Sequence, residues 1–230
     1  MENISIIGVG KLGLCFSLSL EKAGYNVTGI DVVESYVTQL NNKTFNSNEP
    51  GVNKRLKECT NFTATVDLEK TLTSSVIFVI VATPSLPSGR YDHKQLDSVV
   101  EKLMGYGPRK ERVELVINAT TMPGYCDEIQ NRLKDYNYYV SYNPEFIAQG
   151  SILKDQENPD MVLIGGRDDN SCKTIKAIYE DMCDNTPYIA EMNALSAEIT
   201  KLSLNCFLTT KISFANMIGD ISEKVGGETS

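Results

Sequence analysis

Three glycines near the start of the chain, and one acid beyond them, are the residues whose spacing most clearly indicates chemistry. Residues 4–7 read Ile-Ser-Ile-Ile, and Gly8, Gly10 and Gly13 follow in the order GxGxxG. In this motif the first glycine permits a tight turn, the second lets the backbone approach a diphosphate, and the third lets the next helix pack closely. The N-terminus of that helix offers free N–H groups to the phosphates. The spacing therefore predicts a dinucleotide site at Gly8, Gly10, Lys11, Leu12 and Gly13.

Asp31 indicates which dinucleotide binds, because it stands 18 residues after Gly13 at the end of the next apolar run. A carboxylate at this point accepts hydrogen bonds from both ribose hydroxyls and repels a 2′-phosphate. Val32, Val33 and Glu34 follow, so no Arg or Lys stands directly beside it. We therefore expect NAD rather than NADP. The alternative is a glycine-rich turn in some other α/β protein, which the strand before the motif and the amphipathic segment after it disfavour.

Strand-like runs alternate with amphipathic runs along the chain. The expected strands are 3–8, 26–31, 76–82, 113–119, 138–142 and 161–164, and the expected helices are 11–24, 33–41, 94–104, 124–134 and 169–182. The runs at 76–82 and 113–119 are nearly all apolar, which is typical of parallel strands covered on both faces. The predicted fold class is α/β, a doubly wound and mostly parallel Rossmann-like sheet, in which ligands bind at the carboxyl ends of the strands.

Three segments complete the predicted organisation. Residues 62–65 and 187–190 are short runs of uncertain type, and the polar stretch 41–61 is expected to be a surface excursion. Residues 193–225 contain no Pro and no Gly before Gly219, which predicts one helix of about thirty residues. We expect a dinucleotide-binding domain at 1–190 and the start of a connecting and dimerising helix at 191–230. Such a helix needs a second domain or a partner subunit to pack on.

Composition limits the partners and the compartment. The 230 residues are 41% apolar and 23% charged with a net charge of −8, which is ordinary for a soluble globular protein and disfavours nucleic acid or an anionic membrane. The longest apolar run, 76–82, is too short to cross a bilayer. Six cysteines without a CxxC pair, and one His, give no zinc spacing. With no basic, apolar leader, we expect a reduced, cytoplasmic protein without a metal.

Five motifs in order along the chain resemble those of the UDP-glucose/GDP-mannose dehydrogenase family, with the UDP-glucose 6-dehydrogenases as the most similar branch. The first is GVGKLG with Asp31, and the second is Val-Ala-Thr-Pro at 81–84 followed by Gly-Arg-Tyr-Asp at 89–92. The third is Thr-Thr-Met-Pro-Gly at 120–124, and the fourth is Asn-Pro-Glu-Phe-Ile-Ala-Gln-Gly at 143–150, leading to Asp155 and Pro159-Asp160. The fifth is Ala-Glu-Ile-Thr-Lys-Leu-Ser-Leu-Asn at 197–205 with Lys-Ile-Ser-Phe at 211–214.

The resemblance implies a specific reaction and specific residues. Family enzymes oxidise the C6 alcohol of a nucleotide sugar to a carboxylate in two hydride transfers to two NAD, while a cysteine holds the intermediate. By resemblance, Thr121 positions water, Glu145 handles a proton or water, and Lys201 and Asn205 stabilise the developing oxyanion. The cofactor contacts implied beyond the glycine loop are Thr83, Pro84, Thr121 and Gln149. The substrate contacts implied are Glu145, Phe146, Ile147, Lys201 and Asn205.

Elementary geometry agrees with these roles without establishing them. Lys201 and Asn205 are four residues apart, so on a helix they share a face and can reach one oxygen. Taken alone, Lys201 reads more simply as a solvated helix charge, Glu145 as a loop charge or helix cap, and Thr121 as a cap of the next helix. The family resemblance, rather than the spacing, supports the functional reading of all three.

The chain departs from the family pattern in three ways. Gln149 stands where the family often has a second glutamate, and an amide cannot act as a base. Met161 stands where the family has the Arg of Pro-Asp-Arg. The family's Gly-Gly-x-Cys nucleophile motif does not occur in residues 1–230; Cys206 points away from its neighbour Asn205, and Cys126, near Thr121, is a weaker candidate. We therefore expect the N-terminal half of a dehydrogenase with the C-terminal substrate domain absent.

These departures leave three functional readings open. The first is the NAD-binding portion of a UDP-glucose-oxidising enzyme, which binds NAD but does not complete the oxidation alone. The second is a sibling acting on GDP-mannose or a UDP-N-acetyl sugar. The third is a non-catalytic NAD-binding or assembly module. In each case the apolar stripe on the terminal helix predicts self-association, as a homodimer in the family arrangement.

Overall fold

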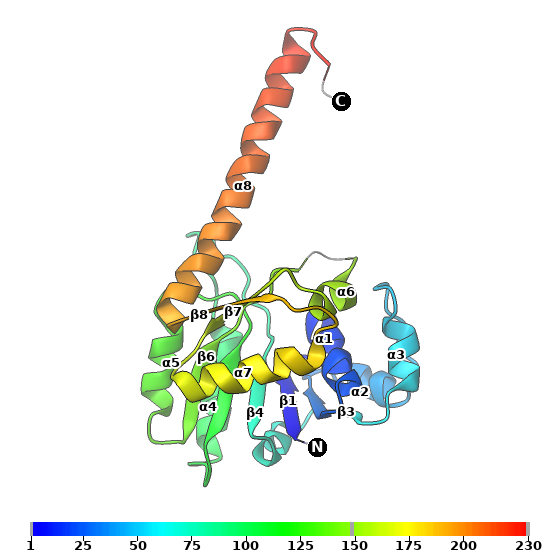
Figure 1. Cartoon of the computed structure of the whole chain (residues 1–230), viewed down its shortest axis with the longest axis vertical. Helices are drawn as coiled ribbons and strands as arrows, with labels where there is room; N and C mark the ends of the chain where they lie inside the picture. Colours follow the sequence, from blue (N-terminus) through cyan, green and yellow to red (C-terminus); the bar gives the residue numbers. More distant parts are fainter. Residues whose placement is uncertain (1, 148–149, 229–230) are drawn as a thin grey trace.

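The computed structural model describes residues 2–147 and 150–228, and it shows one eight-stranded sheet with helices packed against it (Figure 1). The strand order is β3-β2-β1-β4-β5-β6-β7-β8, and neighbours pair in parallel except for β6 with β7. The strands are β1 (Asn3–Ile7), β2 (Asn26–Ile30), β3 (Phe62–Thr65), β4 (Val76–Val79), β5 (Val113–Ile117), β6 (Tyr138–Tyr142), β7 (Met161–Gly165) and β8 (Tyr188–Met192). The doubly wound, mostly parallel fold is confirmed.

The central strands are buried on both faces, as their composition predicts. In β4 the side chains alternate between two clusters: Val76 and Phe78 belong to one, and Ile77 and Val79 to the other. The first cluster includes side chains of α1 (Lys11–Lys22) and α7 (Asp169–Met182), and the second includes side chains of α4 (Lys94–Gly105) and α5 (Tyr125–Leu133). Since successive side chains of a strand point to opposite faces, the apolar runs reflect helices on both sides.

The sequence pattern missed several short elements, and the structure resolves the two runs whose type the sequence left uncertain. The uncertain runs at 62–65 and 187–190 are strands β3 and β8, while α2 (Glu34–Asn41) lies where it was expected. The elements without a counterpart in the pattern are α3 (Val52–Glu58), the 3₁₀ helix η1 (Leu68–Thr73) and α6 (Ile152–Glu157). Each is six or seven residues long, which is too short for helical periodicity to stand out.

The expectation that 41–61 is only a surface excursion is wrong for its second half. Val52 and Leu56 of α3 are buried in the core with α1, and Glu49, just before that helix, is 3% exposed. These two apolar residues, four positions apart, anchor the helix, but the residues around them in the sequence are polar, so the sequence pattern does not reveal the helix. The burial of Glu49 follows from hydrogen bonds to residues more than a hundred positions away.

The long terminal helix is confirmed as α8 (Ala194–Lys224), and it projects away from the sheet (Figure 1). Only its first turns pack on the domain, where Ala194, Ala197, Glu198 and Lys201 are buried. Beyond them the helix exposes many large apolar side chains, among them Phe207, Leu208, Ile212, Phe214, Met217, Ile218 and Ile221. Within the described residues, no helix has the length and apolar character that crossing a membrane requires.

Candidate dinucleotide and active site

A cleft runs along the edge of the sheet formed by the carboxyl ends of β1, β2, β4 and β5. It consists of two adjoining cavities of about 550 and 500 Å³, which share Gly10 and residues 80–82 after β4. The strand order reverses between β1 and β4, and a reversal of this kind is where open α/β sheets bind their ligands.

The glycine loop has the geometry that a diphosphate needs. Gly8 adopts φ +91°, and a Cβ there would collide with the carbonyl of Ile80. A Cβ on Gly13 would collide with the carbonyl of Gly8, so α1 can approach the strand only because that residue is glycine. A Cβ on Gly10 would meet nothing within 4 Å, which shows open space beside the backbone. The loop therefore fits a dinucleotide in the way the motif predicts.

Asp31 lies in the first cavity, at the carboxyl end of β2. Its Oδ1 accepts a hydrogen bond from the Val33 amide at 3.1 Å, which orients the carboxylate. Lys94 and Lys102 of α4 border the same cavity, so two basic residues of a different element lie near it even though none follows Asp31 in sequence. The position of Asp31 suits a ribose, as the sequence predicts.

The second cavity brings together Lys11, Leu12, Thr83, Glu145, Ile147 and Lys201, all of which the sequence had singled out. Pro84 lines neither cavity; its carbonyl accepts the Asp92 amide at 2.8 Å and closes the turn in which Ser85 pairs with Tyr91. Gln149 lies outside the described residues. The expected cofactor residues therefore meet in one cleft, apart from Pro84 and Thr121, which line neither cavity, and Gln149.

Glu145 is held in place by the buried Asn143 that precedes it. Asn118 Nδ2 donates to the Asn143 carbonyl at 2.6 Å, and the Tyr179 hydroxyl donates to Asn143 Oδ1 at 2.8 Å. Glu145 as a residue is half-buried, but its Oε1 is fully buried and has no hydrogen-bond partner among the described residues. Burial raises the pKa of Glu145 to about 7, although the charge of Lys201 lowers it. A carboxyl group with this pKa can accept or release a proton near neutral pH.

Lys201 reaches the same place from α8. Its Nζ donates to the Glu145 carbonyl at 2.6 Å and lies 4.5 Å from the centre of the Phe146 ring. Burial lowers the pKa of Lys201, while the neighbouring Glu145 raises it. Asn205 follows one turn later on α8, is partly exposed, and lines neither cavity. The structure therefore joins Lys201 to Glu145 but does not bring Asn205 to them.

The start of α8 is fixed by Glu198, which is fully buried against the N-terminus of α5. Glu198 Oε1 accepts hydrogen bonds from Thr121 Oγ1 at 3.0 Å and from the Cys126 amide at 2.9 Å, and its Oε2 accepts the Gly124 amide at 2.6 Å. The hydroxyl of Thr121 is thus committed to Glu198, and Thr121 is fully buried. Its neighbour Thr120 lines the cleft instead. Sequence reasoning missed Thr120 and gave no role to Glu198.

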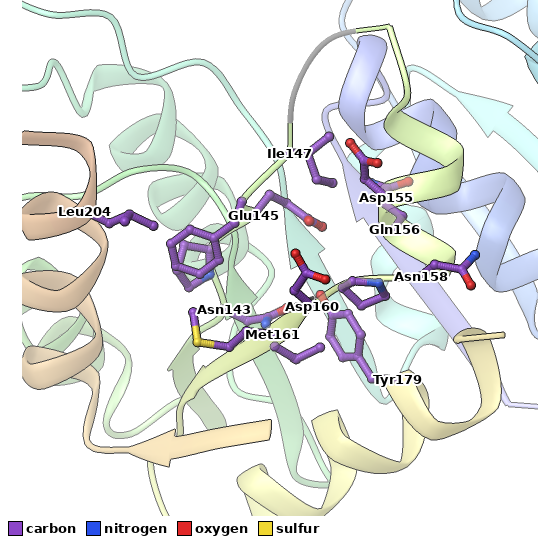
Figure 2. Close-up of a pocket in the computed structure, with 14 residues that line it drawn as sticks. Asn143, Glu145, Ile147, Asp155, Gln156, Asn158, Asp160, Met161, Tyr179 and Leu204 are labelled. Carbon is purple, nitrogen blue, oxygen red and sulfur yellow. Dashed lines mark hydrogen bonds between the residues drawn. The ribbon is translucent and has the colours of Figure 1, made fainter. Parts of the chain in front are cut away.

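A third cavity of about 400 Å³ adjoins the cleft through Glu145 (Figure 2). It lies between the segment after β6 and α6, and Asp155, Gln156 and Asp160 contribute to its wall. Met161 also lines it, at the position where the resemblance predicts an arginine. Glu145 therefore borders two cavities, with the cleft on one side and this acidic space on the other. In the part of the chain described here, no group of His, Cys, Asp or Glu side chains is arranged to hold a metal ion.

Fold and cleft together define a dinucleotide-binding α/β protein. Residues 2–183 match the NAD binding domain of the UDP-glucose/GDP-mannose dehydrogenase family, and residues 195–230 match its central domain. The chain belongs to that family, and the match confirms NAD as the cofactor expected from the glycine loop and Asp31.

Known relatives share this domain at modest identity. An uncharacterised protein of Methanocaldococcus jannaschii is 36% identical over 97% of the chain and 26% of its own length. A UDP-glucose 6-dehydrogenase of Bacillus subtilis is 30% identical over 98% of the chain and 52% of its own length. The ternary-complex structure of GDP-mannose dehydrogenase from Pseudomonas aeruginosa superposes with a TM-score of 0.89 at 28% identity, covering 98% of the chain and 54% of that protein. The chain thus spans about half the length of the named dehydrogenases it resembles.

Proposed function

We propose that this chain supplies the NAD-binding half of a dehydrogenase that oxidises the C6 alcohol of a nucleotide sugar to a carboxylate, with UDP-glucose as the first candidate substrate. One observation supports the proposal most directly: the ammonium of Lys201 donates to the main-chain carbonyl of Glu145, and both residues line the end of a cleft that fits a dinucleotide. The family match and the relatives that act on UDP-glucose and GDP-mannose support it.

The side chains suit the steps of such an oxidation. Bound NAD supplies the hydride acceptor. Lys201, whose side chain is largely desolvated, can stabilise negative charge on an alcohol oxygen as its proton leaves. Glu145, with a pKa of about 7, can take that proton or activate a water. Asn205 is proposed as a second donor from the same helix, and Thr120 or Thr121 as the hydroxyl that orients water.

Calorimetry and product analysis test this proposal. The chain should bind NAD, and incubation with UDP-glucose and NAD should give no sustained UDP-glucuronate, because residues 1–230 lack the Gly-Gly-x-Cys motif. Sustained glucuronate formation by this chain alone would contradict the half-enzyme proposal. A failure to bind NAD would contradict the proposed function as a whole.

Two alternatives have support of their own. The likeness to GDP-mannose 6-dehydrogenase of Pseudomonas aeruginosa, at 29% identity, favours a sibling acting on GDP-mannose or a UDP-N-acetyl sugar. A panel of nucleotide sugars, assayed with a complementing C-terminal half, separates these substrates. Gln149 favours a non-catalytic NAD-binding module, which would gain no activity with any C-terminal half.

We further propose a homodimer formed through α8, with the domain division near residue 190. The exposed apolar side chains between Phe207 and Ile221 support this assembly, because contiguous apolar surface of this kind marks an interaction site. Light scattering over a concentration series tests it, and a monomer at high concentration would count against it. The six free cysteines are consistent with the cytoplasmic location that we also propose.

A further inference from the structure

Glu49 is a buried acid that connects the glycine loop to the start of α6. Its side chain is 2% exposed, and its Oε1 lies 3.0 Å from the ammonium of Lys11. The same oxygen accepts the Gly150 amide at 2.8 Å, and Oε2 accepts the Ile152 amide at 3.3 Å. Glu49 therefore joins two segments that are more than a hundred residues apart in sequence.

Both segments belong to the cleft. Lys11 is the first residue of α1, inside the GxGxxG loop, and it lines the second cavity together with Ile152. The Lys11 side chain is 44% exposed, so its charge reaches solvent at the cleft, whereas the charge of Glu49 does not. Burial acts to raise the pKa of Glu49, but hydrogen bonds from Gly150, Lys11 and Ile152 lower it, which keeps the carboxylate ionised.

A dinucleotide places its diphosphate at this loop, which brings two negative charges beside Lys11. The diphosphate and Glu49 then compete for one ammonium. An acid directly behind a phosphate-binding loop is unfavourable for anion binding unless a cation stands between them, and Lys11 occupies that position.

We propose that Glu49 moderates cofactor affinity: it pairs with the Lys11 ammonium at the cleft, competes for it with the diphosphate of a bound dinucleotide, and thereby links occupation of the cleft to the backbone at Gly150 and Ile152. This inference rests on the proposed NAD-binding function. It predicts the direction in which NAD affinity changes when Glu49 is substituted. A purely structural role for Glu49 can only weaken NAD binding when the residue is changed, whereas removing a competitor for Lys11 strengthens it.

Calorimetric titration of this chain with NAD tests the sign. Glu49→Gln keeps the shape and one acceptor oxygen but removes the charge, and it should tighten NAD binding by about three- to fivefold, the size expected for releasing a partly exposed ion pair. Lys11→Met should weaken binding, and in the Lys11→Met background the Glu49→Gln change should have no effect. The matched control is Glu58→Gln, since Glu58 lies at the end of α3, shortly after Glu49 in sequence, is 64% exposed and pairs with Lys54 at 4.0 Å.

Amide hydrogen exchange tests the link to α6. Addition of NAD should change the exchange rates of the Gly150 and Ile152 amides in the unchanged chain and leave them unchanged in Lys11→Met at saturating NAD. Equal or weaker NAD binding by a folded Glu49→Gln variant, or the same gain without Lys11, would overturn the proposal. If Glu49→Gln does not fold, the exchange comparison decides. Identical NAD-induced changes in amide exchange in the unchanged chain and in Lys11→Met would also overturn the proposal. No NAD binding by the unchanged chain refutes the proposed function instead.

Discussion

Replacing Glu198 by alanine should destabilise the domain strongly, although Glu198 touches neither cavity of the cleft. The carboxylate is fully buried and accepts three hydrogen bonds, from Thr121 Oγ1 and from the amides of Gly124 and Cys126. Each buried donor left without a partner costs about 1–3 kcal/mol. Since water can enter part of the space left by the side chain, we expect a total loss of about 3–5 kcal/mol, out of the 5–15 kcal/mol typical of a domain.

Urea unfolding followed by circular dichroism measures this loss. With a slope of about 2–3 kcal/mol per molar urea for a domain of this size, the midpoint should fall by about 1–2.5 M. Glu223→Ala is the matched control, because Glu223 lies exposed on the same helix. A loss below about 0.5 kcal/mol in Glu198→Ala, equal to the control, would refute the reasoning that Glu198 fixes α8 to α5. The loss in Glu198→Gln should lie between those of Glu198→Ala and the control, because the glutamine amide retains one acceptor oxygen.

Two further predictions concern protonation. Lys201→Met should raise the pKa of Glu145 above about 7, because the charge of Lys201 lowers it, and carboxyl carbon NMR should detect the rise; an unchanged pKa would contradict the coupling. His93 accepts the Met122 amide at 3.2 Å through Nε2, and burial lowers its pKa below 6.5. As the pH falls, the imidazole of His93 therefore becomes protonated in the unfolded chain before it does so in the folded one. The free energy of unfolding should then fall as the pH drops below about 6.5, and His93→Gln should remove this pH-dependent loss.

Much of the fold could be predicted because its signals are local. The glycine spacing defines a turn, a close approach and a helix start within a few residues, and the apolar residues of β4 and β5 reflect burial on both faces. The predicted strand 76–82 is too long by three residues, because residues 80–82 leave the sheet and line the cleft. The helix α8 was predicted because a long periodic run without Pro or early Gly has few alternatives. These elements correspond closely to β1, β4, β5 and α8 in the structure.

Residues whose roles depend on distant partners could not be found in this way. Buried Glu49 accepts hydrogen bonds from the amides of residues 150 and 152, and buried Glu198 accepts one from a hydroxyl 77 residues earlier in the chain. The residues next to them in sequence therefore give no sign of their burial. For a related reason, the sequence could not predict that Thr120 rather than Thr121 lines the cleft. The segment after β5 is irregular, so no period says which of two adjacent hydroxyls faces the cleft. Only packing against α8 commits Thr121 to Glu198.

Calorimetric titration of the chain with NAD and NADP tests the central claim most directly. The geometry of the glycine loop and of Asp31 predicts saturable binding of NAD, clearly weaker binding of NADP, and a loss of this preference in Asp31→Asn, which removes the charge that repels a 2′-phosphate. Absence of NAD binding, or equal affinity of the unchanged chain for both dinucleotides, would contradict the account.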